Sequence, residues 1–353
     1  MTKKLFYLVS IAVVAGMLLT ACAPAATAAP AATAAPAAPA ATTAPAAKAP
    51  IKIGVSIMEL TAYTWYLGVI DGCKQYVVDH PEANFTFQFE DSHSDVQTML
   101  TNIDNLITAG AKGIILFPAD ASSAIPTMKQ YVAKGIPFVI GDYEQKPASP
   151  ADAVWVTYVG HDMKALGVAA GKVAVDYLKT LGKDNPVALF VSRPTSGQVS
   201  QDRIDGFSET IMAAFPKARI IVEGDTGAGS ADSAQTLIEN VLQREPVIDV
   251  VSGHNDAEVR GAYNAAVAAK RTEIKFIGIA GAKQVLTYIS EGNKAWLGEI
   301  LQNPVDLGYQ ATDAMYKALV LGQKLPAKYA LPEPTAITPA NITTFDWQKW
   351  SWL

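Results

Sequence analysis

Four polar side chains stand where they could bind one small molecule. Three of them lie just beyond the carboxyl ends of predicted strands, and one lies in a helix that follows a strand. In chain order they are Asp142, Arg203, Asn255 and Gln302. Carboxylate, guanidinium and carboxamide groups each offer two or more donor or acceptor positions, so such a set can satisfy several hydroxyl groups at once. The residue types therefore predict a binding site for a small polyhydroxylated molecule.

An aromatic cluster precedes the first predicted helix. Tyr63, Trp65 and Tyr66 lie in the loop that begins at Glu59. Their flat apolar faces suit the C–H face of a sugar ring or of a heterocycle. The alternative is that these rings belong to the hydrophobic core. We therefore expect at least one of the three, rather than all, to contact a ligand.

Each polar candidate also has a purely structural interpretation. Asp142 could cap a turn, and Asn255 could cap the helix that follows it, a role compatible with ligand contact. Arg203 could pair with a neighbouring aspartate on a solvated helix face. For Gln302, and for Tyr143 as a further candidate, the register of the surrounding loop leaves both possibilities open.

Motifs of catalysis and of cofactor binding are absent from the sequence. It contains no G-x-S-x-G elbow, no H-E-x-x-H pair, no G-x-x-x-x-G-K-[ST] loop and no EF-hand loop. The loop 224–230 (GDTGAGS) lacks the lysine and glycine spacing of a phosphate loop, which favours a flexible loop at a cleft edge. The histidines lack metal-ligand spacing; they are His80, His93, His161 and His254. We expect a binding protein without cofactor or metal, and an enzyme is the less favoured alternative.

Alternating strands and helices must position the candidate residues. The first unit, 51–78, combines alternating aliphatic residues, a polar aromatic loop and apolar residues at helical spacing. This unit recurs in two runs separated by a Pro-containing linker, which predicts two doubly wound α/β lobes with parallel sheets. A long helix at about 305–321 and a tryptophan-rich tail, expected to pack on a lobe, follow. The expected strands are 51–57, 85–89, 113–117, 137–140, 154–157, 187–191, 219–223, 248–251, 275–279 and 294–300.

The first fifty residues have the character of a delivery segment. Two lysines precede an apolar run that is shorter than the ~20 residues of a spanning helix, which favours a signal peptide at 1–21. The run ends in Leu-Thr-Ala-Cys22, which resembles the bacterial lipobox and implies a lipid on Cys22 after cleavage. The alternative is an ordinary signal-peptidase site with an incidental cysteine. Residues 22–50 are almost entirely Ala, Pro and Thr, which predicts an extended tether.

Composition limits the possible partners. The chain of 353 residues has a formal net charge of −5, and a mildly acidic chain argues against nucleic acid. Half of the residues are hydrophobic, enough for a large core. Cys22 and Cys73 are the two cysteines, so lipidation of the first excludes an internal disulfide. Cys73 lies on the apolar face of the first helix, where we expect a buried and inert thiol.

Four short motifs lie along the predicted strands and helices. In order they are 109–116 (AGAKGIIL), 135–142 (GIPFVIGD), 203–207 (RIDGF) and 250–256 (VVSGHND). These motifs, which follow a lipobox, resemble those of the sugar-binding proteins of bacterial ABC importers. The resemblance is to the ribose- and galactose-binding kind, which are periplasmic binding proteins of type I. The similarity covers 51 to about 320 and implies two lobes of the Venus-flytrap kind, joined by a three-crossing hinge. The implied lobes are 51–160 with 303–330, and 161–302 with 331–353.

The resemblance also implies a site and a function. The polar candidates would hydrogen-bond a ligand and the first-loop aromatics would pack on it, so the implied site residues are Tyr63, Trp65, Tyr66, Asp142, Tyr143, Arg203, Asn255 and Gln302. The implied protein is a monomeric lipoprotein, anchored outside the cytoplasm in the periplasm or on the outer cell surface. It would capture a monosaccharide or polyol and deliver it to an ABC permease. The alternative is a receptor that presents the bound solute to a membrane sensor kinase or chemoreceptor.

Three positions depart from the pattern of that family. Tyr143 stands where the ribose-binding type has an arginine, Ala280 where it has an aspartate, and Gly229 near an expected aromatic residue. These departures argue against ribose or galactose itself. They favour a different monosaccharide, a polyol such as inositol, or a less polar cyclic ligand.

Overall fold

A computed structural model describes residues 49–352 except 62–63, 119, 143–148, 226–228 and 330. Residues from Ala49 onward form one compact unit. The expectations for the signal peptide, for Cys22 and for the tether therefore lie outside the described residues, and so do those for Tyr63 and Tyr143.

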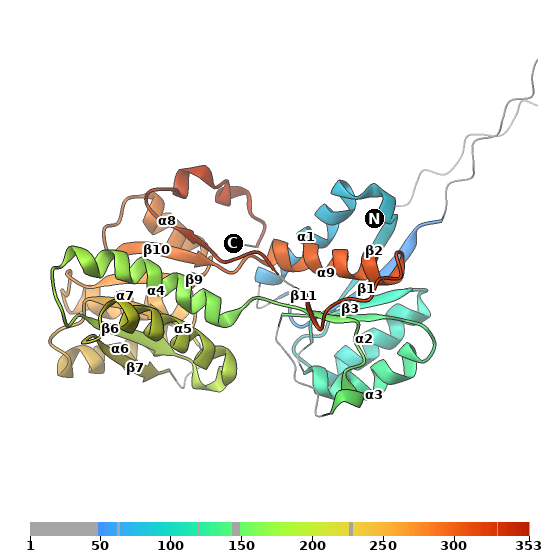
Figure 1. Cartoon of the computed structure of the whole chain (residues 1–353), viewed down its shortest axis with the longest axis horizontal. Helices are drawn as coiled ribbons and strands as arrows, with labels where there is room; N and C mark the ends of the chain where they lie inside the picture. Colours follow the sequence, from blue (N-terminus) through green and yellow to red (C-terminus); the bar gives the residue numbers. More distant parts are fainter. Residues whose placement is uncertain are drawn as a thin grey trace, which may run out of the picture. The chain divides into compact units, whose positions relative to one another are not determined.

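The first sheet contains six strands in the order β11-β5-β4-β3-β1-β2, and every pairing in it is parallel (Figure 1). Its strands are β1 (Ile51–Ile57), β2 (Phe85–Asp91), β3 (Gly113–Leu116), β4 (Phe138–Gly141), β5 (Thr157–Val159) and β11 (Lys328–Tyr329). The central strands β3 and β4 are buried along their whole length, as expected for a parallel sheet covered on both faces.

Helices from both ends of the unit cover this sheet. They are α1 (Trp65–Asp79), α2 (Val96–Thr108), α3 (Ala121–Val132) and α9 (Pro304–Leu319). The helices α1 and α9 pack closely because glycines face the opposite backbone. A Cβ at Gly72 would lie 2.1 Å from the carbonyl oxygen of Val305, and one at Gly308 would lie 2.0 Å from that of Val69. Any larger residue at either glycine would force the two helices apart.

The second sheet has six strands in the order β12-β10-β9-β8-β6-β7. All of its pairings are parallel except that of β12, which runs antiparallel to β10. Its strands are β6 (Val187–Ser192), β7 (Arg219–Gly224), β8 (Val250–Gly253), β9 (Lys275–Ala280), β10 (Trp296–Leu301) and β12 (Thr335–Ile337). Its helices are α4 (Met163–Thr180), α5 (Gln198–Ala214), α6 (Ala231–Arg244), α7 (Asp256–Ala268) and α8 (Lys283–Ser290).

The chain passes between the two sheets three times. It leaves the first sheet after β5, returns to it after β10 through α9 and β11, and leaves again before β12. This connectivity confirms the predicted fold of two doubly wound lobes with a three-crossing hinge.

Three short strands differ from the prediction. The strand expected at 154–157 is β5, which begins only at Thr157, where the ladder with Val139 starts. Before it, Val154 and Trp155 pack sideways on the core of the first lobe. The strands β11 and β12 were not predicted, because two and three residues are too short for a visible alternation of apolar side chains.

The tail packs on the second lobe, as expected. Trp347 and Trp352 are 5% and 4% exposed and belong to its core. The tail also reaches the first lobe: the hydroxyl of Ser351 donates to Asp71, and that of Thr64 donates to the backbone oxygen of Trp352 at 3.4 Å. The final residues therefore join both lobes.

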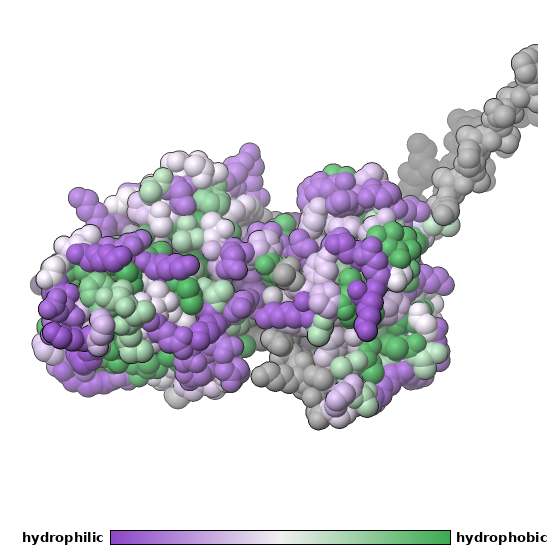
Figure 2. Space-filling model, viewed as in Figure 1, coloured by the Kyte–Doolittle hydropathy of each residue, from purple (hydrophilic) through white to green (hydrophobic). Residues whose placement is uncertain are grey.

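Large hydrophobic side chains are exposed only in small numbers among the described residues. Figure 2 shows a surface on which hydrophilic side chains alternate with hydrophobic ones. The exposed large hydrophobic residues are scattered, which is ordinary for a folded surface. They are Val78, Val132, Met212, Val222, Val247, Val267, Val320 and Leu321. No helix among the described residues is long and apolar enough to cross a membrane.

Candidate functional site

A cavity of about 230 Å³ lies at the carboxyl ends of strands from both sheets. Parallel strands present their carboxyl ends at one edge of a sheet, and loops at that edge are where such folds bind ligands. The cavity is lined by Met58, Trp65, Tyr66, Asp142, Met163, Arg193, Val199, Arg203, His254, Asn255, Ala280 and Gln302. All the predicted site residues that the structure describes are in this set. We call it the inner cavity.

Asp142 enters the inner cavity from the end of β4. Its φ of 76° lies in the left-handed region, which is strained for a residue other than glycine. Its amide donates to the carbonyl of Val159 at 3.0 Å, and its own carbonyl accepts from the Tyr158 hydroxyl at 2.6 Å. The hydroxyl of Tyr66 donates to Oδ2 at 2.5 Å. The surrounding structure thus fixes a strained backbone so that the carboxylate faces the cavity.

The same carboxyl group is 5% exposed. Burial raises the pKa of Asp142 to about 6. The hydrogen bond from Tyr66 and the positive charge of Arg203 both lower this pKa, but by less than burial raises it. Asp142 is therefore ionised at neutral pH and becomes protonated in mildly acidic solution.

Arg203 is buried and is held by neutral acceptors. Its guanidinium donates to the carbonyl of His254, to the sulfur of Met163 at 3.3 Å and to Oε1 of Gln302 at 2.8 Å. The neighbouring aspartates of α5 accept hydrogen bonds from glutamines instead. The structure therefore contradicts the alternative in which Arg203 pairs with an aspartate on a solvated face.

The positive charge of Arg203 acts on the two histidines near the inner cavity. Burial, reinforced by Arg203, lowers the pKa of His161 to about 4. The same two causes, with a contribution from Arg193, lower the pKa of His254. Both imidazoles are therefore neutral at physiological pH.

Gln302 connects the two lobes at the second crossing. Its side chain accepts from Arg203, and its backbone oxygen accepts from Nε1 of Trp65 at 2.9 Å. Trp65 in turn packs edge-to-face on Tyr66, with ring centroids 5.1 Å apart. Tyr66 is 3% exposed and also belongs to the core of the first lobe, so the core interpretation holds for part of this ring.

Asn255 has the capping role that was its structural alternative. Its Oδ1 accepts from the amide of Ala257 at 2.9 Å and caps α7. Its carboxamide nitrogen makes no hydrogen bond within the described part of the chain, and the side chain lines the inner cavity. The cap thus fixes the side chain and leaves its donor available.

Arg193 is a cavity residue that the sequence analysis missed. It directly follows β6, and its guanidinium binds the fully buried carboxylate of Glu258 at 2.7 Å. It also donates to the carbonyl of Gly229 at 3.2 Å. A Cβ at Gly229 would lie 2.2 Å from this guanidinium, so Arg193 covers the place where an aromatic residue was expected. Its position directly after a strand, like that of Asp142, was the signal that could have found it.

One cluster of metal-binding residue types occurs among the described residues. Ligand atoms of Glu59, Asp91 and His93 lie within 4.8 Å of one another. Spacing in the sequence did not indicate this group, because its members lie at the carboxyl ends of two adjacent strands. Both carboxylates accept backbone amides: Oε1 of Glu59 from Thr61 at 2.8 Å, and the oxygens of Asp91 from Leu60 at 3.1 Å and His93 at 2.9 Å. The hydrogen bond between Leu60 and Asp91 connects the loop after β1 with the end of β2.

The fold and the inner cavity define the protein as a periplasmic binding protein of type I. A family model described as the periplasmic binding protein domain matches residues 53–324, and the chain belongs to this family. The family consists of substrate-binding proteins and not of enzymes.

The chain is also similar to individual members of this class. The xylitol-binding protein of Mycolicibacterium smegmatis is 27% identical over 296 residues, which cover 82% of this chain and 78% of the relative. The D-ribose/D-allose-binding protein of Pseudomonas aeruginosa is 24% identical over 250 residues, covering 70% of this chain and 76% of the relative. A solved structure titled as a periplasmic ribose ABC transporter from Conexibacter woesei superposes with a TM-score of 0.72 at 20% identity, covering 84% of this chain and 94% of that one.

Proposed function

We propose that this protein captures a monosaccharide or related polyol in the inner cavity and delivers it to an ABC permease. The observation that carries the proposal is the convergence of Asp142, Arg203 and Asn255 from separate strands and helices on one cavity that Trp65 also lines. A carboxylate, a guanidinium and a carboxamide beside an indole can satisfy hydroxyl groups and cover a ring or carbon chain.

A ligand that contacts both lobes would favour their closed arrangement. Asp142 and Trp65 belong to the first lobe, and Arg203 and Asn255 belong to the second. A ligand that hydrogen-bonds to both sides binds the closed arrangement more tightly than the open one, and only this difference can shift the equilibrium between them. The closed lobes would be the form that a permease recognises.

Two further parts of the proposal concern location. Membership of the periplasmic binding protein family supports a place outside the cytoplasm. A lipid on Cys22, implied by the lipobox resemblance, would anchor the protein at the membrane through the tether. The named ligands of the relatives, xylitol and the sugars ribose and allose, support a polyol or monosaccharide as the solute.

A thermal-shift screen of the full-length protein tests the capture. The probes are pentoses, hexoses, polyols, nucleosides and amino acids, and a ligand that binds the native state raises the melting temperature. We expect a shift with at least one sugar or polyol and loss of that shift in Arg203→Ala. The control Asp184→Asn changes an exposed carboxylate and should keep the shift. If only nucleosides or amino acids raise the melting temperature, or if no probe raises it, the proposal is overturned.

A further inference from the structure

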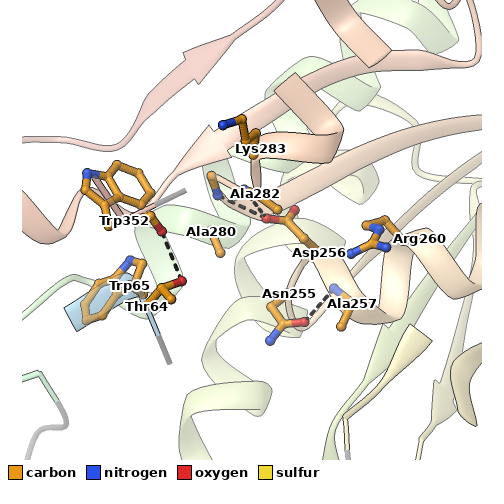
Figure 3. Close-up of a pocket in the computed structure, with 11 residues that line it drawn as sticks. Thr64, Trp65, Asn255, Asp256, Ala257, Arg260, Ala280, Ala282, Lys283 and Trp352 are labelled. Carbon is orange, nitrogen blue, oxygen red and sulfur yellow. Dashed lines mark hydrogen bonds between the residues drawn. The ribbon is translucent and has the colours of Figure 1, made fainter. Parts of the chain in front are cut away.

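A second cavity of about 320 Å³ adjoins the inner cavity (Figure 3). We call it the outer cavity. It shares a wall with the inner cavity, because Trp65, Asn255 and Ala280 line both. The remaining lining residues are Thr64, Asp256, Ala257, Arg260, Gly281, Ala282, Lys283 and Trp352.

A small side chain lies in the wall that the two cavities share. Ala280 ends β9 with a φ of 142° and contributes only a methyl group to the shared wall. Glycine and alanine follow it at Gly281 and Ala282. Figure 3 shows Trp65 and Trp352 opposite these small residues, so the outer cavity has flat aromatic sides and an alanine-lined floor. Ala280 therefore takes up less room at the shared wall than a larger residue would.

Two cations and one acid line the outer cavity. Arg260 and Lys283 project from α7 and α8, and neither makes a hydrogen bond or ion pair at contact distance within the described ranges. Asp256 is the one acid in the lining, and its Oδ2 accepts from the amides of Gly281 at 3.1 Å and Ala282 at 2.7 Å. Arg260 acts on this carboxylate only through space.

The second oxygen of Asp256 is also turned away. A Cβ at Gly278 would lie 2.5 Å from Oδ1 of Asp256 and 1.9 Å from Oε2 of Glu299, so both oxygens lie beside this glycine of β9. The negative charge of Asp256 is thus held by backbone amides at the floor. The two unpaired cations remain for a ligand.

We propose that the outer cavity binds an anionic substituent of the captured molecule, and that the natural ligand is a sugar or polyol carrying a phosphate or carboxylate group. This inference rests on the proposed function, since the neutral part of the ligand would occupy the inner cavity. An anion placed between Arg260 and Lys283 gains two charge-assisted contacts, and Trp65 covers the carbon chain that joins the two parts.

Matched pairs of probes test the inference on the full-length protein by titration calorimetry. The neutral probes are D-ribose, D-galactose, xylitol and myo-inositol, and each is compared with its own monophosphate. We expect the phosphate of at least one binding pair to bind about tenfold tighter than its neutral partner at low salt. The ratio should shrink as ionic strength rises, because Lys283 is exposed to solvent.

Single substitutions distinguish binding of the phosphate in the outer cavity from a general effect of the protein's positive charges. Lys283→Ala and Arg260→Gln should each reduce the ratio of phosphate to neutral affinity several-fold. Lys217→Ala is the matched control, because this exposed lysine precedes β7 at the opposite end of the strands. A neutral probe that binds as tightly as its phosphate overturns the anionic subsite and leaves the proposed function standing. Failure of every probe, neutral and anionic, overturns the proposed function itself.

Discussion

Replacing Asp142 with asparagine tests two effects of its buried negative charge. The charge should strengthen ligand binding, and it should lower the stability of the free protein. The substitution keeps the shape of the side chain and an oxygen that can accept from the hydroxyl of Tyr66. Asparagine also tolerates the left-handed backbone at this position. What changes is the negative charge, which in the proposed function accepts hydrogen bonds from ligand hydroxyl groups.

The first expected result concerns ligand affinity and its dependence on pH. A hydrogen bond to a charged acceptor is worth about 1.5–3 kcal/mol, so Asp142→Asn should weaken binding at pH 7.5 by about that amount. In the wild type, protonation of a group with a pKa of about 6 should weaken binding about tenfold between pH 7.5 and pH 5. His161, with a pKa of about 4, stays neutral across this range and does not contribute.

The second expected result is a gain in stability of the free protein. Burial raises the folded-state pKa of Asp142 from 3.8 to about 6, so the folded state binds this proton more tightly than the unfolded state. The free energy of unfolding therefore falls as the pH rises from about 4 to about 6, by roughly 3 kcal/mol at most. Asp142→Asn should unfold at a higher temperature than the wild type at pH 7.5, and the difference should disappear below about pH 4.

Calorimetric titration and thermal unfolding at pH 4, 5, 6 and 7.5 measure both results on the same samples. Asp184→Asn is again the control, because its carboxylate is exposed and should change neither quantity. Affinity that stays constant between pH 7.5 and 5, or that falls equally in Asp142→Asn, would refute the role of the charge. An asparagine variant that is less stable than the wild type at pH 7.5 would refute the buried-charge argument.

Three other changes test separate parts of the structure. Arg203→Ala should weaken ligand binding by about 1.5–3 kcal/mol in calorimetry, and unchanged affinity would remove this residue from the site. Gly229→Ala should lower the melting temperature more than Gly182→Ala, because both glycines have φ near 65° but only the first would place a Cβ against Arg193. Equal decreases would show that backbone strain alone destabilises the protein and that the contact with Arg193 adds nothing. Cys22→Ser should move the protein from the membrane fraction to the soluble fraction, and continued membrane association would contradict the lipid anchor.

The sequence predicted the lobes because buried parallel strands leave a strong pattern. Runs such as 113–117 and 187–191 are continuously apolar, and each is followed by a helical period. The site residues were predictable for a related reason. Asp142, Asn255 and Gln302 each follow such a strand, and parallel topology brings those ends together.

What the sequence could not show were features that depend on contacts between distant segments. The two-residue strand β11 forms because it pairs with β5, which lies far earlier in the sequence. Just before β11, the backbone oxygens of Pro326 and Ala327 accept from the hydroxyl of Thr157 at 2.7 and 3.5 Å. The pairing of Arg193 with Glu258 joins the end of β6 to the first turn of α7, and nothing in the spacing of either residue announces it. Short elements and ion pairs are decided by the assembled lobe.

The departures at Gly229 and Ala280 change the balance of hydrogen-bond donors in the site. Arg193 adds a guanidinium over Gly229, and a guanidinium offers donors only. Ala280 offers no acceptor at the shared wall. Oε1 of Gln302 already accepts from Arg203, so among the cavity residues described here Asp142 is the main charged acceptor left for a ligand. A sugar or polyol can meet this balance, because its hydroxyl oxygens accept from the guanidinium and carboxamide donors while one of its hydroxyl groups donates to Asp142.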